Sequence, residues 1–328
     1  MQLATLPRFP LATTPTPLQR VETFELALGN DSPAIYIKRD DLTGLAFGGN
    51  KARKLEYLVA DALAVGATAL ISEGAVQSNH ARMTAAAAAV AGLRCALVLD
   101  ARHGTDVKGN LLLDHLLGAE VHIVPDDAAR AETMEAVAAG LRESGEMPYV
   151  IPTGGSVPLG AASYVAATLE LLQQLNEVEE APRRLYHATG SLGTQAGLVV
   201  GARAFSAPYA VYGVAVSHPR EALIAKGISL ANETAALLDL DAEFTADDVV
   251  IDGGFVGERY GVATEGGLEA IRLLARTEGI LLDPVYSGKA MAALIDHIRS
   301  GDLSHADTVA FLHTGGGPSL FAFGTALL

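Results

Sequence analysis

The chain has 328 residues, which at about 150 residues per domain predicts two domains. Half of the residues are hydrophobic and 19% are charged, which supplies ample core and excludes an intrinsically disordered chain. With 38 acidic residues against 23 lysines and arginines, the net charge of −15 argues against nucleic acid or an anionic membrane surface as a partner.

The first half of the chain alternates helices and strands. Apolar residues recur at helical spacing over 55–63, and Gly66 supplies a helix stop. The segments that follow are predicted as a strand at 67–72, a helix at 79–91, a strand at 93–99, a helix at 110–117, a strand at 120–124, a helix at 126–144 and a strand at 148–151. Short apolar strands separated by helices indicate a parallel sheet covered on both faces.

The second half repeats the alternation. We predict strands at 185–189, 211–216 and 309–314, and helices at 194–203, 266–278 and 287–299. Glycine-rich turns separate many of these elements. The expected fold is α/β, with two three-layer α/β/α domains and mostly parallel sheets, and with a site where the strand ends meet.

The single cysteine and the N-terminus bear on location. Cys95 lies in the apolar run 93–99, which predicts a buried strand residue rather than a nucleophile. It cannot form an internal disulfide, which is typical of a reducing compartment. Prolines interrupt the N-terminus, and no apolar run reaches the roughly 18 residues of a membrane span. We therefore expect a soluble, cytoplasmic protein.

The segment 47–55 places two glycines and Asn50 directly before a predicted helix. Lys51 should lie in the first turn, where the positive end of the helix disfavours an ammonium and favours bound anions. A lysine held there is a candidate for Schiff-base chemistry, because a lowered pKa exposes its neutral amine. A solvated lysine at a helix start is the alternative.

The segment 74–82 also joins a strand to a helix. Ser78 and Asn79 are residue types that cap helices, and capping alone would explain both. In the functional interpretation, the Ser78 hydroxyl and the free N–H groups of this turn bind a carboxylate.

A third strand–turn–helix junction spans 188–197. Backbone N–H groups in such a glycine turn can form a nest for a phosphate, to which Thr194 adds a hydroxyl. The turn lacks the ending of a nucleoside-triphosphate loop, and Leu192 and Gln195 fall where the dinucleotide-binding pattern needs glycine. A plain tight turn is the alternative to phosphate binding.

Two further turns could line a site. In 282–289, Pro284 fixes an extended turn and Tyr286 would project from a strand-to-helix junction. The run 313–317 follows a hydrophobic strand, and its Thr314 could reach a ring nitrogen. Ordinary turn chemistry explains either segment equally well.

Taken in order, these five segments resemble the pyridoxal-phosphate (PLP) enzymes of the tryptophan-synthase-β fold type, also called fold type II. More narrowly, the chain is similar to the branch that holds aminocyclopropane-carboxylate (ACC) deaminase and D-cysteine desulfhydrase. The resemblance runs from 16–18 and 37–41 to 313–316, nearly the whole chain. It implies PLP as cofactor, a small amino acid as substrate and, by analogy with dimeric members of the fold type, a homodimer.

The resemblance also implies roles for individual residues. Lys51 would bond covalently to the cofactor and later move the Cα proton of the substrate. Asn79 would contact the ring hydroxyl of the cofactor, and Thr314 its ring nitrogen. The phosphate would bind at Gly190, Ser191, Leu192, Gly193 and Thr194. The substrate side would be formed by Ser78, Gln77, Tyr260, Tyr286 and Ser287.

Two positions discriminate within the branch. ACC deaminases resemble this pattern but carry Glu after the tyrosine and Leu before the closing glycines, where this chain has Ser287 and Thr314. A carboxylate beside the ring nitrogen makes the cofactor a stronger electron sink, as ring opening would need. Elimination of a sulfur group needs a weaker electron sink. The chain therefore looks like the desulfhydrase side, with D-cysteine converted to pyruvate, sulfide and ammonia by α,β-elimination.

Other functions stay open. L-Cysteate sulfo-lyase chemistry releases sulfite by the same steps, and its sulfonate would call for further cationic or N–H partners, for which His80, Arg82 and His103 are candidates. ACC deaminase activity is a further alternative. A non-catalytic PLP-binding protein is a hypothesis from another class, against which the retention of Lys51 argues. No metal site is predicted, because the nine histidines are scattered and Cys95 has no partner.

The motif order sets the expected domain division. Lys51 lies at one seam of the chain, and the phosphate loop lies in the other half. We expect a large PLP-binding domain of residues 1–54 plus 161–328, with a small α/β domain of residues 55–160 inserted in it.

Overall fold

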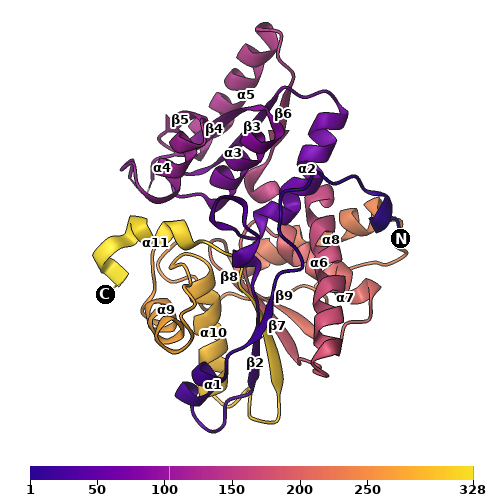
Figure 1. Cartoon of the computed structure of the whole chain (residues 1–328), viewed down its shortest axis with the longest axis vertical. Helices are drawn as coiled ribbons and strands as arrows, with labels where there is room; N and C mark the ends of the chain where they lie inside the picture. Colours follow the sequence, from indigo (N-terminus) through magenta and orange to yellow (C-terminus); the bar gives the residue numbers. More distant parts are fainter. Residues whose placement is uncertain (103, 328) are drawn as a thin grey trace.

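The computed structural model describes residues 1–102 and 104–327, which form two sheets flanked by helices (Figure 1). The strands are β1 (Leu18–Arg20), β2 (Ala34–Lys38), β3 (Ala69–Ala75), β4 (Arg94–Asp100), β5 (Glu120–Val124), β6 (Pro148–Ile151), β7 (Arg184–Thr189), β8 (Ala210–Ala215), β9 (Val250–Asp252) and β10 (Thr308–Leu312). The helices are α1 (Glu22–Leu28), α2 (Lys51–Ala64), α3 (Asn79–Ala91), α4 (Gly109–Leu116), α5 (Asp127–Glu143), α6 (Pro158–Glu177), α7 (Gly193–Ala204), α8 (Arg220–Leu237), α9 (Glu265–Glu278), α10 (Ser287–Arg299) and α11 (Gly317–Phe323).

The larger sheet has the strand order β1-β2-β10-β7-β8-β9, and the smaller has the order β5-β4-β3-β6. All neighbouring strands are parallel except β1 and β2. The predicted fold class is thus confirmed. The four strands of the small sheet fall within 55–160, although both ends of that range lie inside helices, α2 and α6. The domain division itself stays a prediction.

Each sheet is covered by helices on both faces, because its strands alternate apolar side chains between two cores. In β3, Leu70 packs into a core shared with α2 and α3, whereas Ala69 and Ile71 pack under α5. In β10, Phe311 packs toward α9 and α10, and Leu312 toward α6, α7 and α8. Figure 1 shows the small sheet and its helices in the upper part of the molecule, and the large sheet below.

Several elements agree closely with the sequence expectations and others were missed. Helices α3 and α10 and strands β5 and β6 have the predicted bounds, and Cys95 is buried in β4. Strand β10 ends at Leu312 rather than 314, because the chain turns there and Gly315 adopts a φ of +94°. The sequence analysis did not identify α1, α6, α8, α11, β1, β2 and β9. Helix α6 is rich in small residues and broadly buried, so it lacks a one-sided apolar pattern.

A buried ionic network joins α2 to the large sheet and to α6. Arg53 on α2 donates to both carboxylate oxygens of Asp40 and of Glu170 at 2.8 to 2.9 Å. Lys38, at the end of β2, donates to Glu170, and the Tyr164 hydroxyl donates to Asp40 at 2.7 Å. Burial opposes ionisation of Asp40, but the Arg53 guanidinium outweighs it and holds the pKa of this carboxyl below its ordinary value. The network therefore fixes the helix that begins with Lys51.

None of the helices in the described part of the chain is both long and apolar enough to cross a lipid bilayer.

We expect Arg53→Met to lower the free energy of unfolding by roughly 3–5 kcal/mol, because it leaves Asp40, which is 0% exposed, as an uncompensated buried charge. Urea denaturation measures this loss. Arg299→Met is the control, since its pair with Glu269 is about half exposed and should cost only about 0.5 kcal/mol. Equal losses in the two variants would contradict the role given to the network.

Candidate active site

A cavity of about 680 Å³ opens where the carboxyl ends of strands from both sheets meet. Its walls include Lys51, the turn after β3 and the turn after β7. A narrower extension reaches past Lys51 to the turn after β10, which contributes Thr314. The expected site at strand ends is therefore present, and most of the predicted residues lie around one space. They are Lys51, Ser78, Asn79, Gly190, Ser191, Leu192, Thr194, Tyr260, Tyr286 and Thr314.

Two glycine turns interlock to place Lys51. Gly49 has a φ of +130°, and a Cβ there would lie 3.0 Å from the carbonyl oxygen of Thr314. A Cβ on Gly315 would lie 2.6 Å from the Cα of Gly49, so the two backbones approach as only glycines allow. The Asn50 N–H donates to the Thr314 carbonyl at 3.0 Å. The first turn of α2 is thereby fixed against the end of β10.

The Lys51 amine has the properties of a nucleophile. Nζ donates to Asn50 Oδ1 at 2.8 Å and lies 6.0 Å from the centre of the Tyr286 ring. Burial, together with the nearby Arg82 guanidinium, lowers the pKa of Lys51 to about 8. A substantial neutral fraction near physiological pH suits attack on a carbonyl carbon.

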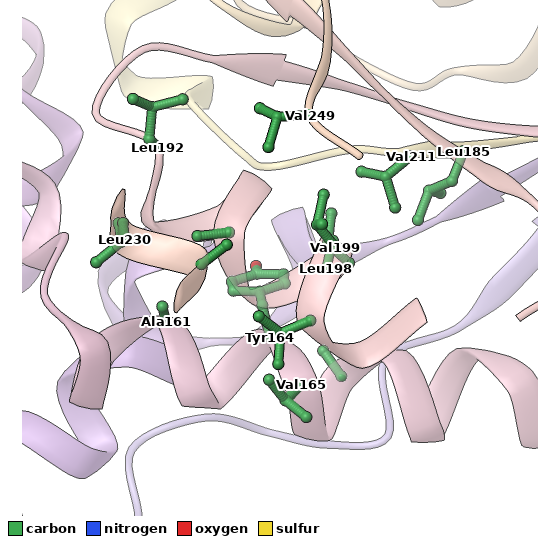
Figure 2. Close-up of a cluster of buried hydrophobic side chains, with 14 of the residues drawn as sticks. Ala161, Tyr164, Val165, Leu185, Leu192, Leu198, Val199, Val211, Leu230 and Val249 are labelled. Atoms are coloured by element: carbon green, nitrogen blue, oxygen red, sulfur yellow. The ribbon is translucent and has the colours of Figure 1, made fainter. Parts of the chain in front are cut away.

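The turn after β7 presents free donors to the cavity. The backbone N–H groups of Ser191, Leu192 and Thr194 have no hydrogen-bond partner within the described ranges. Leu192 has a φ of +74°, and its side chain is buried at the edge of the core cluster in Figure 2. Anchoring this side chain in the core holds the turn open at the N-terminus of α7. The Gly193 N–H is the exception, since it donates to Ser156 Oγ at 3.1 Å.

Lys54 is a site residue that the sequence analysis missed. Its side chain is buried, donates to the Gly154 carbonyl at 3.0 Å, and has a pKa held well below the ordinary value by burial and by Lys51. A Cβ on Gly193 would lie 2.7 Å from Lys54 Nζ, which places the amine directly beneath the turn after β7. The available signal was its spacing, one helical turn after Lys51.

These residues fit PLP. Free N–H groups at the start of the twelve-residue helix α7, with the Thr194 hydroxyl and the Lys54 amine beside them, are the donor set that a phosphate needs. The Asn50 amide donates to Thr194 Oγ1 at 2.9 Å and so links the turn to the helix that carries Lys51. An amine, a phosphate cradle and polar groups at Asn79 and Thr314 therefore surround one narrow space.

The Ser78–Asn79 turn combines capping with site formation. Ser78 Oγ accepts the Ala81 N–H at 3.2 Å, so the N-cap interpretation is confirmed. Ser78 also lines the cavity, and its hydroxyl hydrogen has no acceptor among the described residues. Capping and substrate contact are thus compatible, and the second remains a prediction.

Two tyrosines line the cavity next to each other. The hydroxyls of Tyr260 and Tyr286 share a hydrogen bond, and their rings meet edge to face at 5.9 Å. Burial raises the pKa of both phenols, so each stays protonated at neutral pH. The Tyr286 backbone is fixed by its N–H, which donates to the buried Asp283 carboxylate at 2.9 Å.

Three predicted residues do not line this cavity: Gly193, whose N–H donates to Ser156 Oγ, and Ser287 and Gln77. Ser287 is fully buried, and its hydroxyl donates to Asp283 Oδ1 at 2.7 Å and accepts the Asp283 N–H at 2.8 Å. It shapes the turn that carries Tyr286 rather than the cavity wall. Gln77 lines a neighbouring cavity of about 340 Å³, where its amide donates to the Lys108 carbonyl and accepts the Asn110 N–H at the start of α4.

The three residues predicted as candidate sulfonate partners differ in position and in their hydrogen bonds. His80 lies on the cavity wall but its Nε2 bonds Ser72 Oγ at 2.9 Å, and burial holds its pKa well below the ordinary value. Arg82 is 0% exposed, and its Nη1 and Nη2 donate to protein acceptors. His103 lies outside the described residues.

The profile of the family of pyridoxal-phosphate dependent enzymes matches residues 10–315 of the chain. The protein belongs to this family, which confirms the expected fold type and cofactor.

Relatives and solved structures narrow the similarity. The chain is 43% identical to a D-cysteine desulfhydrase of Klebsiella pneumoniae (strain 342) over 98% of this chain and 99% of the relative. It is 44% identical to a D-cysteine desulfhydrase of Salmonella typhi over 98% and 97%. An ACC deaminase homologue of known structure has a TM-score of 0.90 and 38% identity, with 99% and 96% of the two chains covered. A threonine deaminase of known structure has a TM-score of 0.64 and 27% identity, with 92% of each chain covered.

The pKa of Lys51 predicts how fast PLP attaches to the apoenzyme. At pH 7 roughly one Lys51 in ten is neutral, against about one in three thousand for an ordinary lysine. Since only the neutral amine attacks, the rate constant should rise with pH up to about 8 and level off above it. Stopped-flow absorbance measures this profile, with Lys51→Ala as the control that forms no borohydride-sensitive band. A rate that keeps rising beyond about pH 10, as for an ordinary lysine, would refute the lowered pKa.

Proposed function

We propose that this protein is a carbon–sulfur lyase that converts D-cysteine and water to pyruvate, hydrogen sulfide and ammonia. The observation that carries the proposal is the similarity, over nearly the full length of both chains, to D-cysteine desulfhydrases. The site supports it with a neutral hydroxyl, Thr314, at the end of the cavity where the resemblance places the ring nitrogen.

Side chains of this protein can carry out the proton transfers of the elimination. When bound, PLP withdraws electrons from the bonds at the substrate Cα and so weakens the Cα–H bond. The Lys51 amine is the basic group of the narrow space, and in its neutral form it can take the Cα proton. The electron pair of that bond then forms the Cα–Cβ double bond as the Cβ–S bond breaks.

The tyrosine pair can supply the proton that the departing sulfur needs. Tyr286 borders both the narrow space and the wider cavity, and its hydroxyl bonds that of Tyr260. Two phenols kept protonated by burial form a short donor relay at the wall of the cavity. The Ser78 hydroxyl and the N–H groups at the start of α3 can hold the substrate carboxylate.

L-Cysteate is the second candidate substrate, and one observation favours it. The cavity of about 340 Å³ beside Tyr260 and Tyr286 is lined by three cationic side chains, Arg102, Lys108 and Arg259. Such a cavity can take a sulfonate on Cβ, although Arg102 already binds the buried Asp100 carboxylate at 2.9 Å. Release of sulfite would then replace release of sulfide.

We further propose that the enzyme works in the cytoplasm as a homodimer. The lone cysteine, buried and free, suits a reducing compartment. Helices α4 and α11 contact each other and expose large apolar side chains, Leu116 at 73% and Phe321 at 76%. This surface is the face that a second copy would cover, and sedimentation at the monomer mass alone would contradict the dimer.

Pyruvate release tests the substrate directly. We expect D-cysteine to be turned over with a kcat/KM at least tenfold above those of L-cysteine, L-cysteate, D-serine and the cyclopropane amino acid, a difference of about 1.4 kcal/mol in transition-state binding. Tyr286→Phe should lower kcat by two orders of magnitude or so if its hydroxyl moves a proton. Sulfite release from L-cysteate exceeding sulfide release from D-cysteine would replace the first proposal by the second.

A further inference from the structure

The amide of Asn79 has only one possible orientation toward the cavity. Its Oδ1 accepts two hydrogen bonds, from Arg82 Nη1 at 3.0 Å and from Asn110 Nδ2 at 3.0 Å. Both donors are buried on the protein side of the residue. Since a carbonyl oxygen has two lone pairs, its capacity is filled, and Asn79 can present only its NH₂ group to the cavity that it lines.

Arg82 also reaches the turn that carries Lys51. Its Nη2 donates to the Gly48 carbonyl at 2.9 Å, and its Nη1 donates in addition to Asn110 Oδ1 at 2.9 Å. The guanidinium therefore joins the start of α3, the start of α4 and the diglycine turn before α2. A guanidinium is required at this position, because its planar set of N–H donors can reach three acceptors that lie in different directions.

The guanidinium is held by geometry rather than by a direct ion pair. Asp114 is the acidic group that acts on the pKa of Arg82. The Nε of Arg82 and both carboxylate oxygens of Asp114 are buried without hydrogen-bond partners in the described part of the chain. Burial lowers the pKa of Arg82 only to about 10, so the group stays charged at neutral pH. A cation on the far side strengthens the polarisation of the Asn79 amide, which makes its NH₂ a better donor.

We propose that Arg82 is a positioning residue that locks Asn79 as a hydrogen-bond donor toward the PLP ring while holding the Lys51 turn against the same helix. The role rests on the family's use of PLP and not on which amino acid is the substrate. A donor at this place favours an unprotonated oxygen on the cofactor ring over a protonated one.

A double-mutant cycle tests the coupling between the two residues. PLP affinity and the absorbance maximum of bound PLP are measured for wild type, Arg82→Lys, Asn79→Ala and the double variant. Arg82→Lys keeps the charge and removes the fork, so it should weaken PLP binding on the order of tenfold and shift the absorbance maximum. In the Asn79→Ala background, the same change should leave the absorbance maximum unchanged and weaken PLP binding less than it does in the wild type, because only the Arg82 contact with the Gly48 carbonyl remains to be lost.

Two further variants complete the test. Asn110→Ala removes the other donor to Asn79 Oδ1 and should show the same loss of effect in the Asn79→Ala background, even if Arg82→Lys fails to fold. Arg184→Lys, at a partly buried arginine that bonds Tyr186 and Asp302 outside the cavity, is the matched control and should leave the spectrum unchanged. Additive effects of Arg82 and Asn79 would overturn the proposal. Bound PLP with a non-additive cycle but no turnover of D-cysteine would instead overturn the proposed function alone.

Discussion

The contact between Arg53 and its two carboxylates is the constraint on which the site depends. Asp40 follows a strand of the large sheet and Glu170 lies on α6, so one guanidinium fixes α2 against both. Lys51 stands two residues earlier in the same helix. The Arg53 guanidinium is buried and fully hydrogen-bonded, so removing it should lower the free energy of unfolding strongly. The same hydrogen bonds leave the first turn of α2 little freedom of orientation.

Glycine turns convert that fixed helix into a site. Close backbone approach between Gly49 and Gly315 brings the end of β10 to Lys51, and the Asn50–Thr194 hydrogen bond brings the start of α7. Local N–H groups and two lysines with lowered pKa values can thus form a place for an anionic cofactor within a chain of net charge −15. The overall charge governs long-range partners, and the local donors govern the cofactor.

Patterns of neighbouring residues in the sequence predicted the turns and helix starts of this site. The glycines, the capping residues and Lys51 could be identified because turn chemistry and helix starts are written in neighbouring residues. The contacts of Arg53, Lys54 and Arg82 could not be predicted, because their partners lie far away in the sequence and only the fold brings them together. Ser287 illustrates the converse, since its hydroxyl is used within its own turn and not at the cavity wall.

The central claim is that Lys51, rather than another buried lysine, carries the cofactor. Lys38, Lys54 and Lys289 are also buried with lowered pKa values, so the pKa alone does not distinguish Lys51 from them. Borohydride reduction of the PLP-loaded enzyme, followed by peptide mass mapping, locates the attached group. A pyridoxyl group is expected on Lys51 and on none of Lys38, Lys54 and Lys289. A stoichiometric adduct on Lys38, Lys54 or Lys289 would contradict the claim.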